Sequence, residues 1–251
     1  MNDSQTEQVV FFGASSEVAQ HVIRLHAEKG DRLRLIARNK ERLDAVAQDA
    51  ATRGAEIIET VCSDLGDIEG IGTLTHSLTE ACNEATIWYF FQGVLPKQKE
   101  SEGDWQIVQN ALDTNFTGIA KSLHYIANHI EKHSGGTVVV ITSVAGLRGR
   151  QSNYIYGTSK GSLNIYLQGL RNRLYKSNGH VLTVMPGFIK TGMTDGFDRD
   201  GPLWATPEQV ANDIYRSMQR RRNICYTPWF WRYIMLIIQH IPEFVFKRLK
   251  L

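Results

Sequence analysis

The chain has 251 residues, of which 42% are hydrophobic and 22% charged, a composition that excludes a largely disordered chain or a fibrous repeat. The formal net charge of +2 argues against a protein built mainly to bind nucleic acid. Three scattered cysteines, Cys62, Cys82 and Cys225, are too few for a disulfide framework and fit a reducing compartment. The polar start, Met1 to Gln8, has no apolar core, so we expect no secretory signal and a cytoplasmic protein.

Short apolar runs alternate along the chain with longer segments of helical period. The runs predict strands at Val9–Gly13, Arg32–Ala37, Ile57–Cys62, Thr86–Phe91, Thr137–Thr142, His180–Met185 and Asn223–Thr227. The segments between them predict helices at Glu17–Lys29, Lys40–Thr52, Ile68–Asn83, Asp104–His133, Ser152–Ser177 and Pro207–Arg220. This alternation predicts an α/β fold with one Rossmann-type, doubly wound, mostly parallel sheet and helices on both faces. Ligands of such a sheet bind beyond the carboxyl ends of its strands.

The first predicted strand leads directly into a turn that contains Gly13, Ser15 and Ser16, and then into a helix. Such a turn offers free backbone N–H groups and the positive end of a helix dipole to a pyrophosphate. An ordinary turn with a serine cap explains the same residues equally well.

Arg38 follows Ala37 at the end of the second predicted strand. A site for NAD usually places a carboxylate here on the ribose 2′-hydroxyl, whereas a basic residue accommodates the 2′-phosphate of NADP. The sequence therefore favours NADP(H), although Arg38 also belongs to a charged run that continues to Arg42 and is typical of solvent-exposed surface.

Tyr156 and Lys160 are four residues apart, which places both on one face of a helix. Asn115 and Ser143 precede them, and the serine lies thirteen residues before the tyrosine at the end of a predicted strand. A tyrosine has a pKa of about 10, which a nearby ammonium lowers. The set suits the protonation of a carbonyl oxygen that becomes an alkoxide as a hydride arrives.

These motifs, in this order from Gly13 to Thr191, resemble the single-domain branch of the short-chain dehydrogenases/reductases. The resemblance implies that Tyr156 is the acid and that Lys160 lowers its pKa and holds the nicotinamide ribose. It also implies that Ser143 orients the carbonyl and that Asn115 holds a helix irregularity and a water in the proton relay. The cofactor residues implied are Gly13, Ser15, Ser16, Arg38, Asp64, Leu65, Gly93, Tyr156, Lys160, Pro186, Gly187, Ile189 and Thr191. Asp64, placed to contact adenine, could equally cap the following helix.

The sequence departs from the family pattern at two places. Glu17 and Ala19 stand where the second and third glycines of the first turn belong, and a glutamate beside phosphates requires a side chain that turns away. Phe90-Phe91-Gln92-Gly93 replaces Asn-Asn-Ala-Gly and lacks the asparagine that ties neighbouring strands together. His129 and His133 have the spacing of a metal pair, but a solvated helix end explains them better, and we expect no metal.

We expect a catalytic domain over residues 1–227 and an extension of the same domain over 228–251. From Arg220 onward, seven basic residues stand against the single acidic Glu243, and seven of the 24 aromatic residues lie here. The apolar run after Pro228 is shorter than the roughly 20 residues that span a bilayer. Two interpretations remain open: a subunit interface or substrate lid, and a helix that lies on a membrane surface beside anionic lipid.

The tail, together with Glu17 in the first turn, also resembles the decaprenylphosphoryl-2-keto-ribose reductases, through Arg232-Tyr233, Met235, His240-Ile241-Pro242 and Phe246-Lys247. The combined prediction is an NADPH-dependent carbonyl reductase, with a lipid-linked keto sugar as one substrate. The alternatives are a dehydrogenase of soluble ketones or hydroxysteroid-like alcohols, and a non-catalytic nucleotide-binding protein. The family resemblance implies a homodimer or homotetramer, and the tail suggests peripheral contact with the inner face of the cell membrane.

Overall fold

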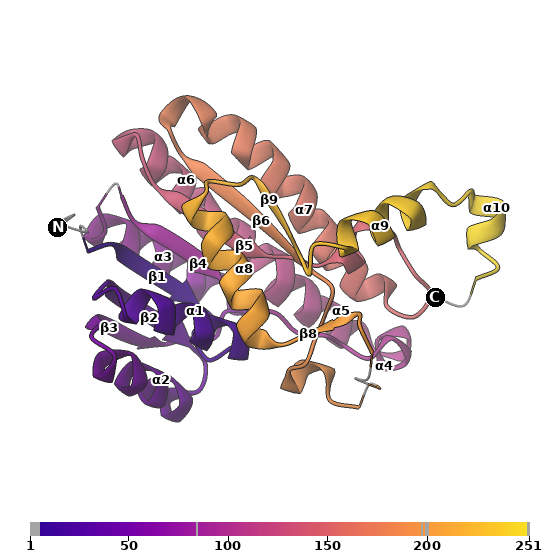
Figure 1. Ribbon diagram of the computed structural model, residues 1–251, viewed down its shortest axis with the longest axis horizontal. Helices are drawn as coiled ribbons and strands as arrows, with labels where there is room; N and C mark the ends of the chain where they lie inside the picture. The colour runs from indigo at the N-terminus through magenta and orange to yellow at the C-terminus, as the bar shows by residue number, and fades with distance from the viewer. Residues whose placement is uncertain (1–5, 84, 197, 199–200, 250–251) are drawn as a thin grey trace.

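Seven parallel strands form the central sheet of the computed structural model, which describes residues 6–83, 85–196, 198 and 201–249 (Figure 1). Their order across the sheet is β3-β2-β1-β4-β5-β6-β9, so the strand order reverses between β1 and β4. The bounds are β1 Gln8–Phe12, β2 Arg32–Ala37, β3 Glu56–Cys62, β4 Ile87–Phe90, β5 Thr137–Ile141, β6 His180–Pro186 and β9 Ile224–Thr227. All seven predicted strands and the doubly wound α/β fold are confirmed.

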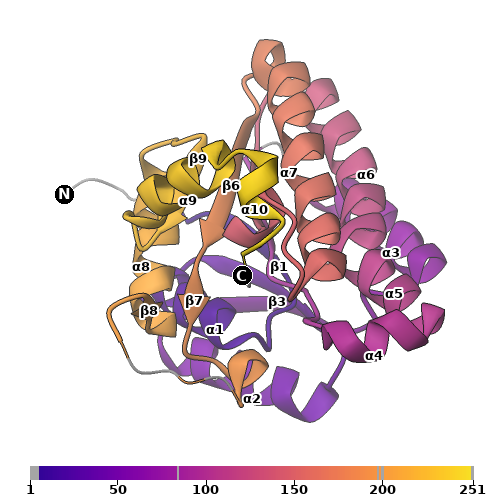
Figure 2. The same ribbon diagram turned by 90° about the vertical axis from the view of Figure 1, so that its right-hand side faces the viewer.

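Helices cover both faces of this sheet, as Figure 2 shows. One layer contains α1 (Glu17–Ala27), α2 (Lys40–Thr52) and α8 (Pro207–Gln219), and the other contains α3 (Ile68–Ala81), α6 (Gly118–His133) and α7 (Tyr154–Leu174). Alternate residues of each strand face opposite layers: Phe11 packs into the core on the α1 side and Phe12 into the core on the α6 side. Because the residues that face either layer are mostly apolar, the strands read as continuous hydrophobic runs in the sequence.

Aromatic stacking joins β1 to β4 on both faces. The rings of Phe11 and Tyr89 lie 4.8 Å apart and nearly parallel, and those of Phe12 and Phe90 lie 4.6 Å apart. Such pairs add about 0.5–1.5 kcal/mol beyond the apolar area that they bury. This stacking links the two strands where the family pattern has an asparagine.

The helix predicted at Asp104–His133 is present and runs without a break from Trp105 to His133, but one turn within it is π-helical. It contains α5 (Trp105–Leu112), a π-helical turn at Asp113–Thr117 and α6, and an unpredicted short helix, α4 (Gln98–Gly103), precedes it. A π turn inserts one extra residue without interrupting the apolar periodicity, so the hydrophobic pattern does not reveal it.

Several further elements lie outside the main sheet. Strands β7 (Phe188–Ile189) and β8 (Trp204–Ala205) pair in parallel, and a short turn at Gly192–Thr194 lies in the loop between them. Helices α9 (Trp231–His240) and α10 (Glu243–Phe246) form the tail, which projects from one end of the molecule in Figure 1. Within the described residues, no helix has both the length and the apolar character needed to cross a membrane. The predicted polar start up to Gln5 and the tail's residues 250–251 lie outside the described residues.

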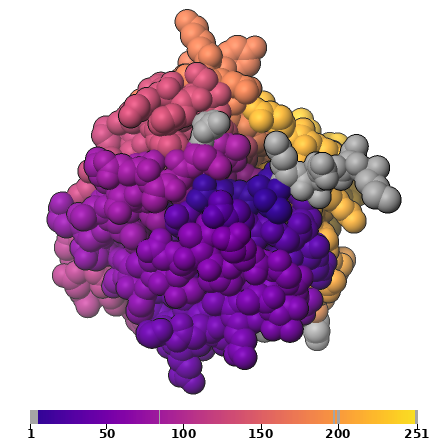
Figure 3. Space-filling view, turned by 90° about the vertical axis from the view of Figure 1, so that its left-hand side faces the viewer, coloured from indigo at the N-terminus to yellow at the C-terminus, as the bar shows by residue number. Residues whose placement is uncertain are grey.

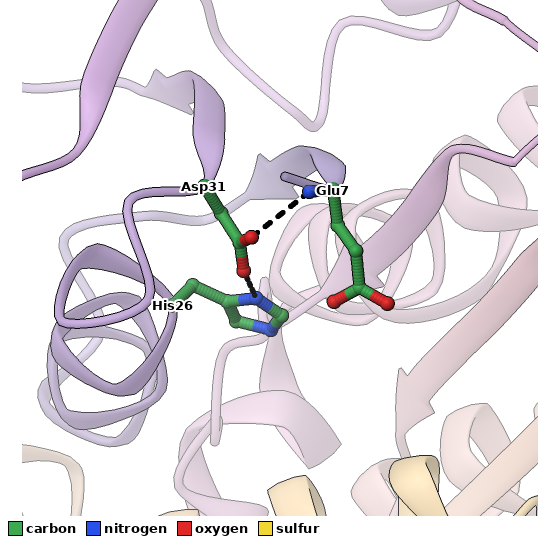
Figure 4. Close-up of side chains that lie close together, drawn as sticks. All are labelled: Glu7, His26 and Asp31. Atoms are coloured by element: carbon green, nitrogen blue, oxygen red, sulfur yellow. Dashed lines mark hydrogen bonds and ion pairs between the residues drawn. The ribbon is translucent and has the colours of Figure 1, made fainter. Parts of the chain in front are cut away.

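The opposite end of the molecule is formed largely by the N-terminal half of the chain, drawn indigo to purple in Figure 3. At the amino ends of β1 and β2, His26 Nδ1 lies 2.6 Å from Asp31 Oδ2, and His26 Nε2 lies 3.1 Å from the Tyr89 hydroxyl. The Glu7 backbone N–H donates to the other Asp31 oxygen (Figure 4). Burial raises the pKa of Asp31, but the hydrogen bonds from His26 and Glu7 outweigh it, so the net direction is down. We interpret this buried network as an anchor between α1, β2 and β4.

Candidate active site

A cleft of about 740 Å³ opens at the carboxyl ends of the strands around the point where the strand order reverses. Eight of the predicted cofactor residues line it: Gly13, Ser15, Ser16, Arg38, Asp64, Leu65, Gly93 and Thr191. Tyr156, Lys160, Pro186, Gly187 and Ile189 are not among its lining residues. The parallel sheet brings the first eight together because the loops after its strands all emerge at one edge.

At two positions in this cleft, other atoms approach the backbone so closely that a glycine is needed. Gly13 has a φ of +82°, and a β-carbon there would lie 2.7 Å from the Gln92 backbone nitrogen. A β-carbon at Gly93 would lie 3.3 Å from both Asn115 Oδ1 and Lys160 Nζ. Any larger residue at position 13 would be strained as well as crowded. These positions keep the cleft open between β1 and β4.

Gln92 carries an unsatisfied buried amide on the wall of the cleft. The residue is 6% exposed, and neither its Oε1 nor its Nε2 has a hydrogen-bond partner in the described part of the chain. A buried amide without partners costs about 1–3 kcal/mol, so such a group calls for a ligand or a role. Together with the glycine cradle and the turn at Ser15 and Ser16, this group fits a dinucleotide.

Positive charge gathers at the end of the cleft formed by β2 and α2. Arg38 and Arg42 both line it, and neither makes an ion pair with any described residue. The neighbouring Arg24 is instead paired with Asp49 at 2.8 Å. Arg42 was missed as a site residue, although its position four residues after Arg38 in the same charged run was a usable signal.

Asp64 does not cap α3, so that alternative is wrong. Its Oδ1 accepts a hydrogen bond from the Gly66 N–H at 2.9 Å, whereas the cap of α3 is Asp67, which accepts from Gly70. The Asp64 carboxylate therefore supports its own loop and lines the cleft beside the buried Leu65.

Asn115 lies in the π-helical turn, as the expected helix irregularity requires. Its side chain pairs with both backbone groups of Val94: Oδ1 accepts from the N–H at 2.8 Å and Nδ2 donates to the C=O at 2.9 Å. Nδ2 also donates to Ser159 Oγ, which in turn donates to the Tyr156 carbonyl. Ser159, not identified from the sequence, thus joins Asn115 to the helix that carries Tyr156.

Tyr156, Lys160 and Ser143 converge beside this turn. Burial raises the pKa of Tyr156, and a hydrogen bond with the Ser143 side chain opposes this, with a net rise. Ser143 Oγ also accepts from the Ala145 N–H at 3.1 Å. The Lys160 ammonium donates to the Ile141 carbonyl at 3.1 Å, and burial lowers its pKa to about 8. The expected lowering of the tyrosine pKa by Lys160 remains a prediction.

Glu17 turns out of the first turn rather than into it. Its Oε1 accepts a hydrogen bond from the Gly192 backbone N–H at 2.6 Å, in the loop that carries Thr191. This is the turned-away side chain that a glutamate at the second glycine position requires.

The tail packs beside the predicted catalytic serine. Trp231 of α9 lies against Gly187, where a β-carbon would collide with its indole ring, and forms a small core with Val144 and Met185. Arg148 ties the other end down: it donates to the Gln239 carbonyl at 2.7 Å, pairs with Glu243 and stacks over the Phe246 ring. The segment after Ser143 is therefore held by the tail.

Comparison with known proteins agrees with this geometry. The family model described as short chain dehydrogenase matches residues 7–201. An uncharacterised oxidoreductase of Mycobacterium tuberculosis is 29% identical over 99% of both chains, and the 11-beta-hydroxysteroid dehydrogenase-like 2 protein of Arabidopsis thaliana is 27% identical over 94% of this chain and 78% of its own.

Among solved structures, a short-chain dehydrogenase from Sphingobium yanoikuyae in complex with NADPH superposes with a TM-score of 0.83 at 21% identity, over 94% of this chain and 97% of the other. The bulky-bulky ketone specific alcohol dehydrogenase of Comamonas testosteroni reaches 0.79 at 19% identity and 96% of each chain. These two structural similarities show the fold alone. The family itself is shown by the family model, which matches most of the sequence. The chain belongs to the short-chain dehydrogenase family.

Proposed function

We propose that the protein is an NADPH-dependent carbonyl reductase. The observation that carries this proposal is the convergence of Tyr156, Ser143, Lys160 and Asn115 beside a cleft that fits a dinucleotide. A binding protein without chemistry has no need of a buried lysine, since keeping that cation out of water is costly. The geometry therefore favours catalysis over nucleotide sensing.

The residues divide the work between proton transfer and orientation. The Tyr156 hydroxyl donates the proton to the carbonyl oxygen, and Ser143, which lies beside Tyr156, fixes the angle of that oxygen. Lys160, with a pKa of about 8, exchanges protons near neutral pH and supports the tyrosine, while Asn115 holds the turn beside it. A bound nicotinamide cofactor supplies the hydride.

NADPH is proposed over NADH because Arg38 and Arg42, at the adenosine end of the cleft, make no ion pair with any residue that the structure describes. The relative from Sphingobium yanoikuyae was solved with NADPH, which supports the same choice. We expect Arg38→Ala to raise the Michaelis constant for NADPH about tenfold and to leave that for NADH nearly unchanged. An equal effect on both cofactors would show that Arg38 does not bind the 2′-phosphate.

The central test is a screen of NADPH oxidation against simple ketones, keto sugars and polyprenyl-linked keto sugars. We expect Tyr156→Phe to lower kcat by about 100-fold or more while NADPH binding, followed by its fluorescence, persists. Tyr154→Phe is the matched control, because this exposed tyrosine lies two residues earlier on the same helix. Full activity in Tyr156→Phe contradicts the mechanism, and NADPH binding without turnover of any substrate favours the non-catalytic alternative.

The tail points to an apolar substrate presented at a lipid surface. Trp229 and Ile237 are 70% and 69% exposed, Tyr233, Leu236 and Phe244 are exposed beside them, and Arg232, Lys247 and Arg248 add positive charge. Apolar side chains flanked by basic ones suit the interface of an anionic membrane. Because the tail also packs beside Ser143, a lipid-linked keto sugar would arrive at the catalytic serine from this side.

Flotation with anionic vesicles distinguishes this substrate class from a soluble ketone or hydroxysteroid-like compound. We expect Trp229→Ala with Ile237→Ser to abolish flotation, whereas Ile165→Ser, which changes an equally exposed isoleucine on α7, leaves it intact. Absence of flotation by the unmodified protein favours the soluble substrate. We also propose a homodimer or homotetramer, which sedimentation analysis of the same variants checks.

A further inference from the structure

One hydrogen bond joins the two ends of the predicted catalytic region. Glu17 begins α1, and its carboxylate accepts from Gly192, which lies 175 residues later in the chain. Both residues line the dinucleotide cleft, together with Ser16 on one side and Thr191 and Met193 on the other. The bond therefore connects the first turn to the loop that follows β7.

The loop around Gly192 is internally ordered. Thr194 Oγ1 donates to the Ile189 carbonyl at 2.7 Å and accepts from the Thr191 N–H, while the Lys190 N–H donates to Ala205 of β8 at 3.0 Å. These bonds make the segment from Ile189 to Thr194 one unit. A unit of this kind is placed by its outside contacts, and the Glu17 carboxylate is one of them.

We propose that Glu17 is a positioning residue that acts through Gly192 and holds the segment Thr191–Met193 against the dinucleotide cleft. This inference rests on the proposed function for its effect on cofactor binding. A glycine at position 17, as in the family pattern, has no side chain to make the bond. The bond to Gly192 directs the carboxylate toward the loop, and the N-terminal end of α1 favours a negative charge at this position.

The decisive variants act on either partner of the bond. Gly192→Pro removes the donor N–H at the first position of the short turn, where proline is tolerated. Gly192→Ala keeps the N–H, and its β-carbon has room at 3.4 Å from Glu17 Oε1. Glu17→Ala removes the acceptor, and Glu17→Gln keeps a weaker, uncharged one.

We expect Glu17→Ala and Gly192→Pro each to weaken NADPH binding about fivefold, with kcat at saturating NADPH changed less than about twofold, as for a partly exposed charge-assisted hydrogen bond. Gly192→Ala, which keeps the N–H, should weaken NADPH binding less than Gly192→Pro, and Glu17→Gln should be intermediate. Combining Glu17→Ala with Gly192→Pro should add nothing further, because both remove one interaction. Glu208→Ala is the charge control, since it removes an exposed carboxylate in the first turn of α8 that does not line the cleft.

Amide hydrogen exchange without cofactor gives a second readout. In Glu17→Ala we expect the Gly192–Thr194 amides to exchange about tenfold faster, with unchanged exchange in Glu208→Ala. If the Glu17→Ala variant shows unaltered exchange, or binds NADPH as tightly as the unmodified protein does, the positioning role of Glu17 is overturned. If the unmodified protein binds no NADPH, the proposed function fails, whereas the exchange result still decides whether Glu17 holds the loop.

Discussion

Lys160 is expected to lower the stability of the fold in exchange for its place in the active site. The side chain is 3% exposed, and burial lowers its pKa from 10.5 to about 8. Because the unfolded chain binds this proton more tightly, the folded state is disfavoured at neutral pH. One pKa unit corresponds to about 1.4 kcal/mol, so the cost at pH 7 is on the order of 3 kcal/mol.

Lys160→Met removes this cost while keeping the length of the side chain. It also removes the hydrogen bond to the Ile141 carbonyl, worth about 1 kcal/mol. We therefore expect the variant to be roughly 2 kcal/mol more stable at pH 7 and to lose its activity. Lys176→Met, which changes an exposed lysine, is the control and should alter stability by less than about 0.5 kcal/mol.

The pH dependence of the stability difference between the two proteins tests the sign of the Lys160 contribution. The folded-state pKa of Lys160 is depressed, so the cost is full below about pH 8 and disappears as the pH rises toward 10.5. Between pH 7 and pH 9 the unmodified protein should gain on the order of 1 kcal/mol relative to Lys160→Met in urea unfolding. A variant less stable than the parent at pH 7, or a constant difference across this range, would refute the reasoning.

Three more changes test the surroundings of the site, and a fourth tests the buried network at the amino ends of the strands. Gly187→Ala should destabilise by about 1–3 kcal/mol in thermal unfolding, because its methyl group collides with the Trp231 ring; an unchanged Tm would contradict that contact. Gln92→Leu should raise Tm by removing an unpaired buried amide, yet weaken NADPH binding, whereas unaltered binding would exclude a cofactor contact. Arg148→Ala should increase amide exchange in α9 and α10, and normal protection would show that Arg148 does not hold the tail. Asp31→Asn should lower the free energy of unfolding at pH 7 by about 3 kcal/mol. Because the pKa of Asp31 is depressed in the folded protein, this difference should be present above pH 3.8 and fade on acidification. A difference that does not change with pH would argue against the stabilising role of the Asp31 carboxylate.

Local patterns predicted much of the architecture. All seven strands of the main sheet were identified: β1, β2, β4, β5 and β6 are largely buried on both faces and read as apolar runs, whereas the edge strands β3 and β9 are partly exposed and gave shorter apolar signals. The placement of Tyr156 and Lys160 on one face of a helix followed from their spacing alone. The π turn around Asn115 was identified only through the family resemblance, since its wider hydrogen bonding leaves no mark on the periodicity.

By itself the sequence determined the strand–helix alternation, the first turn at Gly13 and the helical face that carries Tyr156 and Lys160, because each depends on neighbours within a few residues. Only the tertiary structure decided how distant segments meet: Glu17 with Gly192, Trp231 against Gly187, and Arg148 with the tail. Such contacts depend on how the strands are ordered in the sheet and where its loops emerge. For that reason an apparent defect of the first turn, Glu17, acquires its role from a loop encoded 175 residues away.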